Sequence, residues 1–347
     1  MLKQVVTKTM MIGAAALTLA ACDKSADSYS ILPGDESFQQ EAVFVPKKID
    51  VLWVIDNSGS MKTSQDNLAA SFQSFIARFN QSNYDFHMGV VTTDGWEKQF
   101  DTTSQKARLR DGAGATHSGV FVLDKNTPNL NTVFATNIKQ GTGGNGDERG
   151  LESLRQSLLD PFNNNFRRAD AFLAVIIVSD EEDDSTSVSQ FEVSSKLYPI
   201  SRYTDFLDGL TNSSAGSRNY SVNSIYIQDA ACRDQLNTDG FARTISTRYA
   251  AIADASGGVK ASLCGNFGTS LQLISDSIIQ LSSVFKLNRE PIESSIVIKV
   301  DGVVVPKDAT NGWTYDAATL TITFHGSAVP GANSDIRIAY DPVSIKN

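Results

Sequence analysis

The sequence predicts an α/β fold, a doubly wound and mostly parallel sheet with helices on both faces, followed by a small C-terminal β-domain. The apolar runs at residues 49–55 and 170–180 show little alternation, as in strands that are covered on both faces. Amphipathic helical segments separate these runs, which favours parallel strands. Beyond Pro291 the helical period gives way to short alternating passages, which predicts the β-domain.

The α/β domain is expected over residues 48–289. Its expected strands are residues 49–55, 84–94, 170–180 and 222–228, and its expected helices are residues 65–80, 147–160, 242–256 and 269–285. The first helix repeats apolar residues such as Leu68, Phe72 and Phe79 at helical spacing, and Gly257 closes the third. In a sheet of this kind, ligands collect beyond the carboxyl ends of the strands.

The β-domain is expected over residues 290–347. Its strand passages are residues 294–308, 312–326 and 334–342, with Asp-Gly, Asn-Gly and Pro-Gly turns between them. A domain of this size cannot bury a large core. No chemistry is apparent in it.

The N-terminal residues have the pattern of an export signal. Lys3 and Lys8 precede an apolar stretch that is too short to span a bilayer, which predicts a signal peptide over residues 1–21. The stretch ends in "LAAC", which resembles the bacterial lipobox and implies that Cys22 carries lipid such as palmitate. The alternative is an ordinary secretory signal with a chance cysteine.

Residues 22–47 are polar and without periodicity, as expected of a tether between a lipid anchor and a folded domain. The expected location is therefore the cell envelope, bound to a membrane through the anchor. Asp23 resembles an inner-membrane retention signal, but the choice between inner and outer membrane stays open.

The net charge bears on the kind of partner, and the cysteine content bears on a disulfide. The net charge of −9 becomes more negative when Lys3 and Lys8 leave with the signal peptide, which argues against nucleic acid as a partner. Cys232 and Cys264 are the two cysteines besides Cys22, so an exported chain is expected to join them in a disulfide. The alternative is two buried thiols.

Oxygen-bearing side chains follow the first predicted strand at every second position, as Asp56, Ser58 and Ser60. A second predicted strand ends at Asp180. Oxygen donors that converge at strand ends are the ligands of a hard divalent cation. Each serine alone would be read as a helix cap or turn residue.

The segment "DNSGSM" after a buried strand resembles the DxSxS motif of the von Willebrand factor type A domain and its metal-ion-dependent adhesion site. The resemblance covers about Lys48 to Leu287. It implies that Asp56, Ser58 and Ser60 are the first three ligand positions and that Asp180 is the strand-end acid. The whole chain resembles bacterial lipoproteins with this domain.

One position departs from the family pattern. The resemblance implies a threonine ahead of a helix, and here Asp147 aligns with it, Glu148 is its neighbour and Thr142 is the threonine of that loop. Asp147 and Glu148 are therefore candidate ligands, and the alternative is favourable charge in the first turn of a helix. Residues 181–184 are expected to form a solvated acidic loop rather than a second calcium site.

The expected function is an envelope-anchored, metal-dependent protein-binding module of the adhesion type. Its ion would be Mg²⁺ first, with Ca²⁺ or Mn²⁺ as alternatives, and a partner protein would offer an acidic side chain to it. The alternative is a structural component of an envelope assembly in which the metal only stabilises loops. A hydrolase is the weakest reading and no enzyme is expected, because His87, His117 and His325 match no catalytic motif.

Overall fold

The structure is a computed structural model that describes residues 38–43, 48–81, 84–189, 196–213, 218–330 and 334–343. The expected signal peptide, Cys22 and most of the expected tether lie outside the described residues. None of the helices formed by the described residues combines the length and the apolar character that a bilayer span needs.

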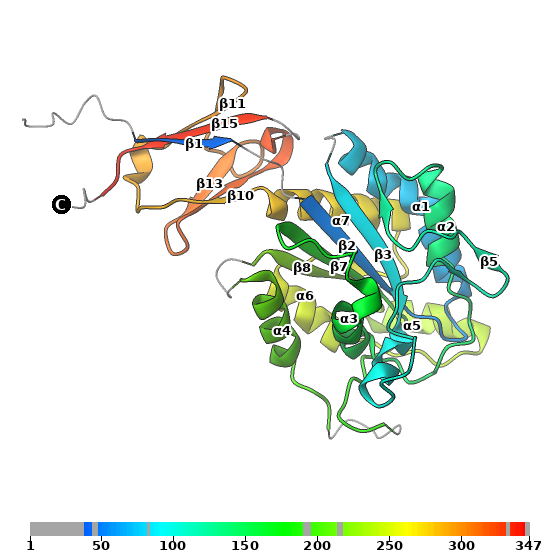
Figure 1. Cartoon of the computed structure of the whole chain (residues 1–347). Helices are drawn as coiled ribbons and strands as arrows, with labels where there is room; N and C mark the ends of the chain where they lie inside the picture. The colour runs from blue at the N-terminus through cyan, green and yellow to red at the C-terminus, as the bar shows by residue number, and fades with distance from the viewer. Residues whose placement is uncertain are drawn as a thin grey trace, which may run out of the picture. The chain divides into compact units, whose positions relative to one another are not determined.

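A mixed sheet forms the centre of the α/β part (Figure 1). Its strands are β2 (Lys48–Ile55), β3 (Phe86–Thr92), β6 (Leu123–Asp124), β7 (Ala171–Val178), β8 (Tyr220–Tyr226) and β9 (Lys260–Ser262). They lie in the order β6-β3-β2-β7-β8-β9, and all neighbours are parallel except β6, which is antiparallel to β3. The predicted doubly wound, mostly parallel sheet is confirmed.

Helices cover both faces of this sheet. One face carries α1 (Lys62–Gln81), α2 (Leu130–Ile138) and α7 (Phe267–Ser282), and the other carries α3 (Gly150–Leu159), α4 (Ser201–Thr211) and α6 (Arg248–Ser256). Side chains of β2 alternate between the two cores, since Val51 and Trp53 join the first and Leu52 and Val54 the second. With both faces of β2 covered, its residues reach a ligand only at the strand end.

The helix expected at residues 242–256 begins six residues late, at Arg248. Residues 242–246 form no regular element, and two of their amides bond outside any helix, since the Thr244 amide donates to the Asp180 carbonyl (3.3 Å) and the Ser246 amide donates to the Ile227 carbonyl (3.3 Å). Three further helices, α2, α4 and α5 (Ala230–Leu236), were not predicted. The remaining short elements are β4 (Gly112–Ala113), β5 (Thr116–His117), η1 (Thr93–Gln99), η2 (Pro161–Asn163) and η3 (Asn237–Asp239).

The β part consists of two small sheets. One has the order β1-β15-β11-β12 and the other the order β10-β14-β13. The strands are β1 (Phe38–Val43), β10 (Val284–Lys286), β11 (Val297–Val300), β12 (Val303–Val305), β13 (Trp313–Asp316), β14 (Thr321–Phe324) and β15 (Asp335–Tyr340), with η4 (Glu293–Ser295) and η5 (Gly326–Ala328) between them. Ile298, Trp313, Phe324 and Ile336 form part of their shared core.

Two strands of the β part lie outside the expected boundaries. β1 falls in the segment expected to be a tether and pairs antiparallel with β15, and β10 precedes residue 290 and pairs with β14. Pairing at a sheet edge uses main-chain hydrogen bonds, so it needs little apolar patterning in the added strand. The turn between β11 and β12 follows its expected Asp-Gly sequence, with Asp301 and Gly302 at φ of 51° and 81°.

Candidate metal centre

The carboxyl ends of β2 and β7 lie side by side and bring two acids together. Ile55 is paired with Val178, and the Asp56 amide donates to the Val178 carbonyl at 3.0 Å. The strand order reverses at this point, which is where open α/β sheets bind ligands. Asp56 is 0% exposed and Asp180 is 1% exposed. Two buried carboxylates thus stand at the edge for which the sequence predicts a cation.

The turn after β2 places hydroxyls between these two acids. The Ser58 and Ser60 hydroxyl oxygens are 3.2 Å apart, and the Ser60 hydroxyl donates to Asp180 Oδ1 at 3.0 Å. Asp56 Oδ1 accepts from the Ser58 amide at 2.8 Å. An octahedral ion with ligands at about 2.1 Å sets neighbouring ligand oxygens about 3 Å apart. The oxygen spacing of this turn therefore fits such an ion.

The loop before α3 is held against the same turn. The Gln65 side-chain amide donates to the carbonyls of Asp56 (3.0 Å) and Gly141 (2.9 Å), and the Gly144 amide donates to the Asn57 carbonyl (2.8 Å). A Cβ at Gly144 would lie 2.5 Å from the Asn57 side chain, so a glycine is needed for this close approach. The contact carries the acids at positions 147 and 148 towards the site.

The two candidate acids of this loop have different surroundings. The Asp147 carboxylate forms an ion pair with Arg149, whose guanidinium lies 4.0 Å from the centre of the Trp96 ring. Glu148 is 1% exposed, and neither of its carboxylate oxygens has a hydrogen-bond partner among the described residues. Thr142, the hydroxyl alternative, is exposed. Glu148 is therefore the acid of this loop that lacks a neutralising group.

Burial, and then repulsion between acids, raise the pKa values of carboxyl groups at this site. Burial, and then the charge of Asp56, raise the pKa of Glu148 well above its usual range; the Thr93 hydroxyl offsets this only in part and does not reach hydrogen-bond geometry. Burial and the charge of Asp180 raise the pKa of Asp56 to about 6, against the hydrogen bonds from the Ser58 amide and Ser179. A cation at this point would relieve both groups.

Glu181 belongs to the same acidic environment. Burial raises its pKa to about 7, with the charges of Asp56 and Asp180 as the next causes. Within the described residues, no three His, Cys, Asp or Glu side chains form a metal-binding group by themselves. The serine hydroxyls lie beside the carboxylates, and a set of carboxylates and hydroxyls would suit a hard divalent cation.

Two residues of the site are absent from the sequence-based prediction. Asp94 follows β3 and accepts hydrogen bonds from the Asn57 side chain (3.3 Å) and the Asn145 amide (2.9 Å). Asp94 is the last residue of the strand predicted at residues 84–94, as Asp180 is of its strand, and this shared position is a signal that could have identified it. Arg243 donates from Nε to Asp180 Oδ2 at 2.5 Å and is 5% exposed. No local signal marks Arg243, because it comes from a segment that the sequence predicts to be helical.

The expectation of a solvated acidic loop at residues 181–184 is wrong for part of the loop. Asp183 is 0% exposed, accepts from the Leu151 amide (2.9 Å) and pairs with Arg248 (2.9 Å). The Glu182 carboxylate accepts from the Thr247 amide (2.8 Å), next to the start of α6. These acids bind to the starts of neighbouring helices, where negative charge is favourable.

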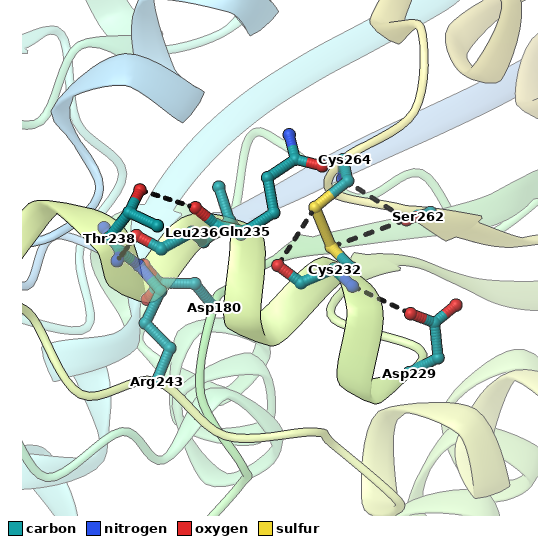
Figure 2. Close-up of a disulfide and its surroundings, with 9 residues drawn as sticks. All are labelled: Asp180, Asp229, Cys232, Gln235, Leu236, Thr238, Arg243, Ser262 and Cys264. Atoms are coloured by element: carbon teal, nitrogen blue, oxygen red, sulfur yellow. Dashed lines mark hydrogen bonds and ion pairs between the residues drawn. A yellow bond between two sulfur atoms is a disulfide. The ribbon is translucent and has the colours of Figure 1, made fainter.

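Cys232 and Cys264 are joined in a disulfide, as the sequence predicts, so the alternative of two buried thiols is wrong. The bond ties α5 to the loop after β9, and the Asp229 carboxylate caps α5 by accepting from the Cys232 amide (2.9 Å). Figure 2 shows the disulfide on the same segment that carries Arg243 to Asp180.

The α/β part is a doubly wound, mostly parallel sheet with helices on both faces and with oxygen-bearing side chains at the ends of β2 and β7, an arrangement similar to the von Willebrand factor A-like fold. No family model and no curated protein matches the chain. The fold assignment therefore rests on the strand order and directions described above.

Solved structures to which the chain is similar include proximal thread matrix protein 1 from the mussel byssus, at 12% identity over 72% of this chain and 52% of that chain, with a TM-score of 0.40. A second structure of that protein has a zinc-occupied MIDAS motif, at 11% identity and a TM-score of 0.36. The pilus adhesin SpaC from Lactobacillus rhamnosus GG matches at 12% identity over 85% of this chain and 39% of that chain, with a TM-score of 0.38. The chain thus spans about half of the mussel protein and less of the adhesin.

Proposed function

We propose that the protein is a metal-dependent protein-binding module of the adhesion type. The observation that carries this proposal is the buried carboxylate of Glu148, which has no hydrogen-bond partner among the described residues and lies close to Asp56. A divalent cation, Mg²⁺ first and Ca²⁺ or Mn²⁺ as alternatives, would be held by Asp56, Ser58, Ser60 and Glu148. The bound ion would supply a Lewis-acidic position for an oxygen of the partner.

The partner would approach from the side of Gly59. Gly59 is exposed and Ser60 is half-buried, whereas Asp56 and Ser58 are buried. Phe241 is 47% exposed and lies beside this opening, since a Cβ at Gly59 would be 3.2 Å from its ring. An acidic side chain of the partner would thus reach the ion while its aliphatic part packs on the ring.

A pull-down from solubilised envelopes tests the proposal. We expect partners to be captured in Mg²⁺, lost in EDTA and regained when Mg²⁺ is restored. Asp56→Ala should lose the same partners, whereas Asp170→Ala, which removes an exposed acid from the other end of β7, should retain them. Capture that is indifferent to EDTA and to Asp56→Ala would contradict a metal-dependent interface.

A second candidate function is a structural one, in which the ion only stabilises the loops. It is favoured by the charge balance, because Asp56 and Glu148 together neutralise a divalent cation and Asp180 is already paired with Arg243. Water proton relaxation of the Mn²⁺-loaded protein separates the two functions. Two or more exchangeable water ligands favour the binding module, and none favours the structural role.

We further propose that Cys22 anchors this non-enzymatic module to the cell envelope through lipid. The support is the "LAAC" boundary behind a short apolar stretch. Mass spectrometry of the purified protein should find a lipidated N-terminal Cys22. An unmodified Cys22 behind an intact leader would contradict the anchor.

A further inference from the structure

Arg243 has a hydrogen-bond acceptor for every donor of its guanidinium. Nε donates to Asp180 Oδ2 (2.5 Å), and Nη1 donates to the Leu236 carbonyl (2.6 Å) and Asp239 Oδ1 (2.7 Å). Nη2 donates to Asp239 Oδ2 (2.7 Å) and to the Ser60 carbonyl (3.3 Å). The group is therefore fixed against both the DxSxS turn and the strand-end acid, as Figure 2 shows for Asp180.

We propose that Arg243 is a built-in counter-ion and positioning residue of the metal centre. It neutralises Asp180 in the metal-free protein, aims Asp180 Oδ1 at the Ser60 hydroxyl, and weakens divalent-cation binding through its own charge. This inference rests on the proposed metal site at Asp56, Ser58 and Ser60.

The division of the Asp180 carboxylate between two donors supports this role. Oδ2 faces Arg243 and Oδ1 accepts from Ser60, so each oxygen has its own partner. The planar guanidinium of Arg243 also donates two parallel hydrogen bonds to Asp239, which fix its orientation towards Asp180. A lysine ammonium cannot form this paired arrangement. Arg243 thus keeps Asp180 in the role of an acceptor for Ser60.

The disulfide fixes the acceptors that orient Arg243. Leu236 is the last residue of α5, Asp239 ends η3, and α5 is bonded through Cys232 to Cys264. Figure 2 shows the disulfide, Leu236 and Arg243 along one continuous segment. The position of the guanidinium therefore depends on a covalent anchor outside the site.

The positive charge of Arg243 determines how its removal should change the stability of the metal-free fold and the affinity for a divalent cation. Without Arg243, a buried carboxylate that is 1% exposed loses its cation, which destabilises the metal-free fold. The same change removes a positive charge beside the incoming ion and leaves Asp180 available as a further ligand, which strengthens metal binding. A residue with a purely structural role would lower stability equally with and without metal.

The experiment compares the full mature chain with Arg243→Met and Arg243→Lys, by thermal melts in EDTA and in Mg²⁺ and by calorimetric titration with Mg²⁺. In EDTA we expect Arg243→Met to melt on the order of 10 °C lower than the wild type. We expect it to bind Mg²⁺ at least about tenfold more tightly, which raises the Mg²⁺-dependent increment in Tm by roughly 3–5 °C. Arg243→Lys, which keeps the charge, should change Mg²⁺ affinity less.

Arg168→Met is the matched control, since Arg168 pairs with buried Asp50 (2.8 Å) at the opposite end of the same sheet. It should lower Tm equally in EDTA and in Mg²⁺. Suppose that the wild type binds Mg²⁺ and that Arg243→Met shows neither tighter Mg²⁺ binding nor a larger Mg²⁺-dependent rise in Tm. The proposed role of Arg243 is then overturned, whereas the metal site is not. If Mg²⁺ binds neither protein, both the inference and the metal site are overturned.

Discussion

The substitution Glu148→Gln tests whether the buried carboxylate of Glu148 destabilises the metal-free protein and serves to bind a metal ion. Glu148 is 1% exposed and unpartnered, and burial together with the charge of Asp56 raises its pKa well above the usual 4.5. Burial without a partner therefore disfavours the charged form of this carboxyl in the metal-free folded protein. We expect Glu148→Gln to stabilise the metal-free protein and to abolish most of its Mg²⁺ affinity.

The direction of the effect follows from proton linkage. A group with a raised folded-state pKa stabilises the fold below its unfolded pKa, and this stability is lost as the pH rises from 4.5 towards the folded pKa. The magnitude follows from burial, because a buried polar group without a hydrogen-bond partner costs about 1–3 kcal/mol. A protonated carboxyl and an amide lose similar hydrogen bonds to water, so glutamine should recover most of the cost that the charged form adds at pH 7.

Chemical denaturation in EDTA at pH 4.5 and pH 7 measures the effect. The gain in the free energy of unfolding from Glu148→Gln should be close to zero at the lower pH and about 1–3 kcal/mol at the higher one. The matched control is Glu152→Gln in the following helix, where the buried carboxylate pairs with Arg155 (3.1 Å) and Arg202 (3.3 Å) and the change should destabilise. A Glu148→Gln protein that is no more stable than the wild type at pH 7 would refute the reasoning.

Two further predictions concern pH and the disulfide. Because the pKa of Asp56 is raised to about 6 and that of Glu148 is also raised, Mg²⁺ must displace protons at low pH, so its affinity should rise between about pH 5 and pH 7. Calorimetric titrations across this range check it, and a pH-independent affinity would contradict it. Replacing Cys232 and Cys264 by serine opens a link across 32 residues and should cost about 3–4 kcal/mol, visible as a lower Tm that reductant does not change further. An unchanged Tm would argue against a stabilising disulfide.

The part of the site that could be predicted from sequence depends on local patterns. Asp56 and Asp180 each follow an apolar strand that is buried on both faces. A parallel sheet brings the carboxyl ends of such strands to one edge. The same patterns predict the doubly wound sheet and most of its helices. Residues adjacent in sequence to these strands were therefore placed correctly.

The rest depends on contacts between distant segments. Arg149 pairs with Asp147, whereas Glu148 has no hydrogen-bond partner among the described residues, and no spacing rule reveals this difference. Arg243 reaches Asp180 because residues 242–247 bind to strand ends through their backbone, against a helical pattern. β1 joins β15 by main-chain hydrogen bonds, which leave little trace in the side chains of a polar segment.

The central claim is that the ends of β2 and β7 hold a divalent cation. Its most direct test is calorimetric titration of the mature chain with Mg²⁺, with Asp56→Ala as the variant and Asp170→Ala as the control. We expect one ion to bind to the wild type and to Asp170→Ala, and none to Asp56→Ala, which removes a ligand beyond the end of β2 and leaves the sheet core intact. A wild type that binds no divalent cation at millimolar concentration, or an Asp56→Ala variant with undiminished affinity, would contradict the claim.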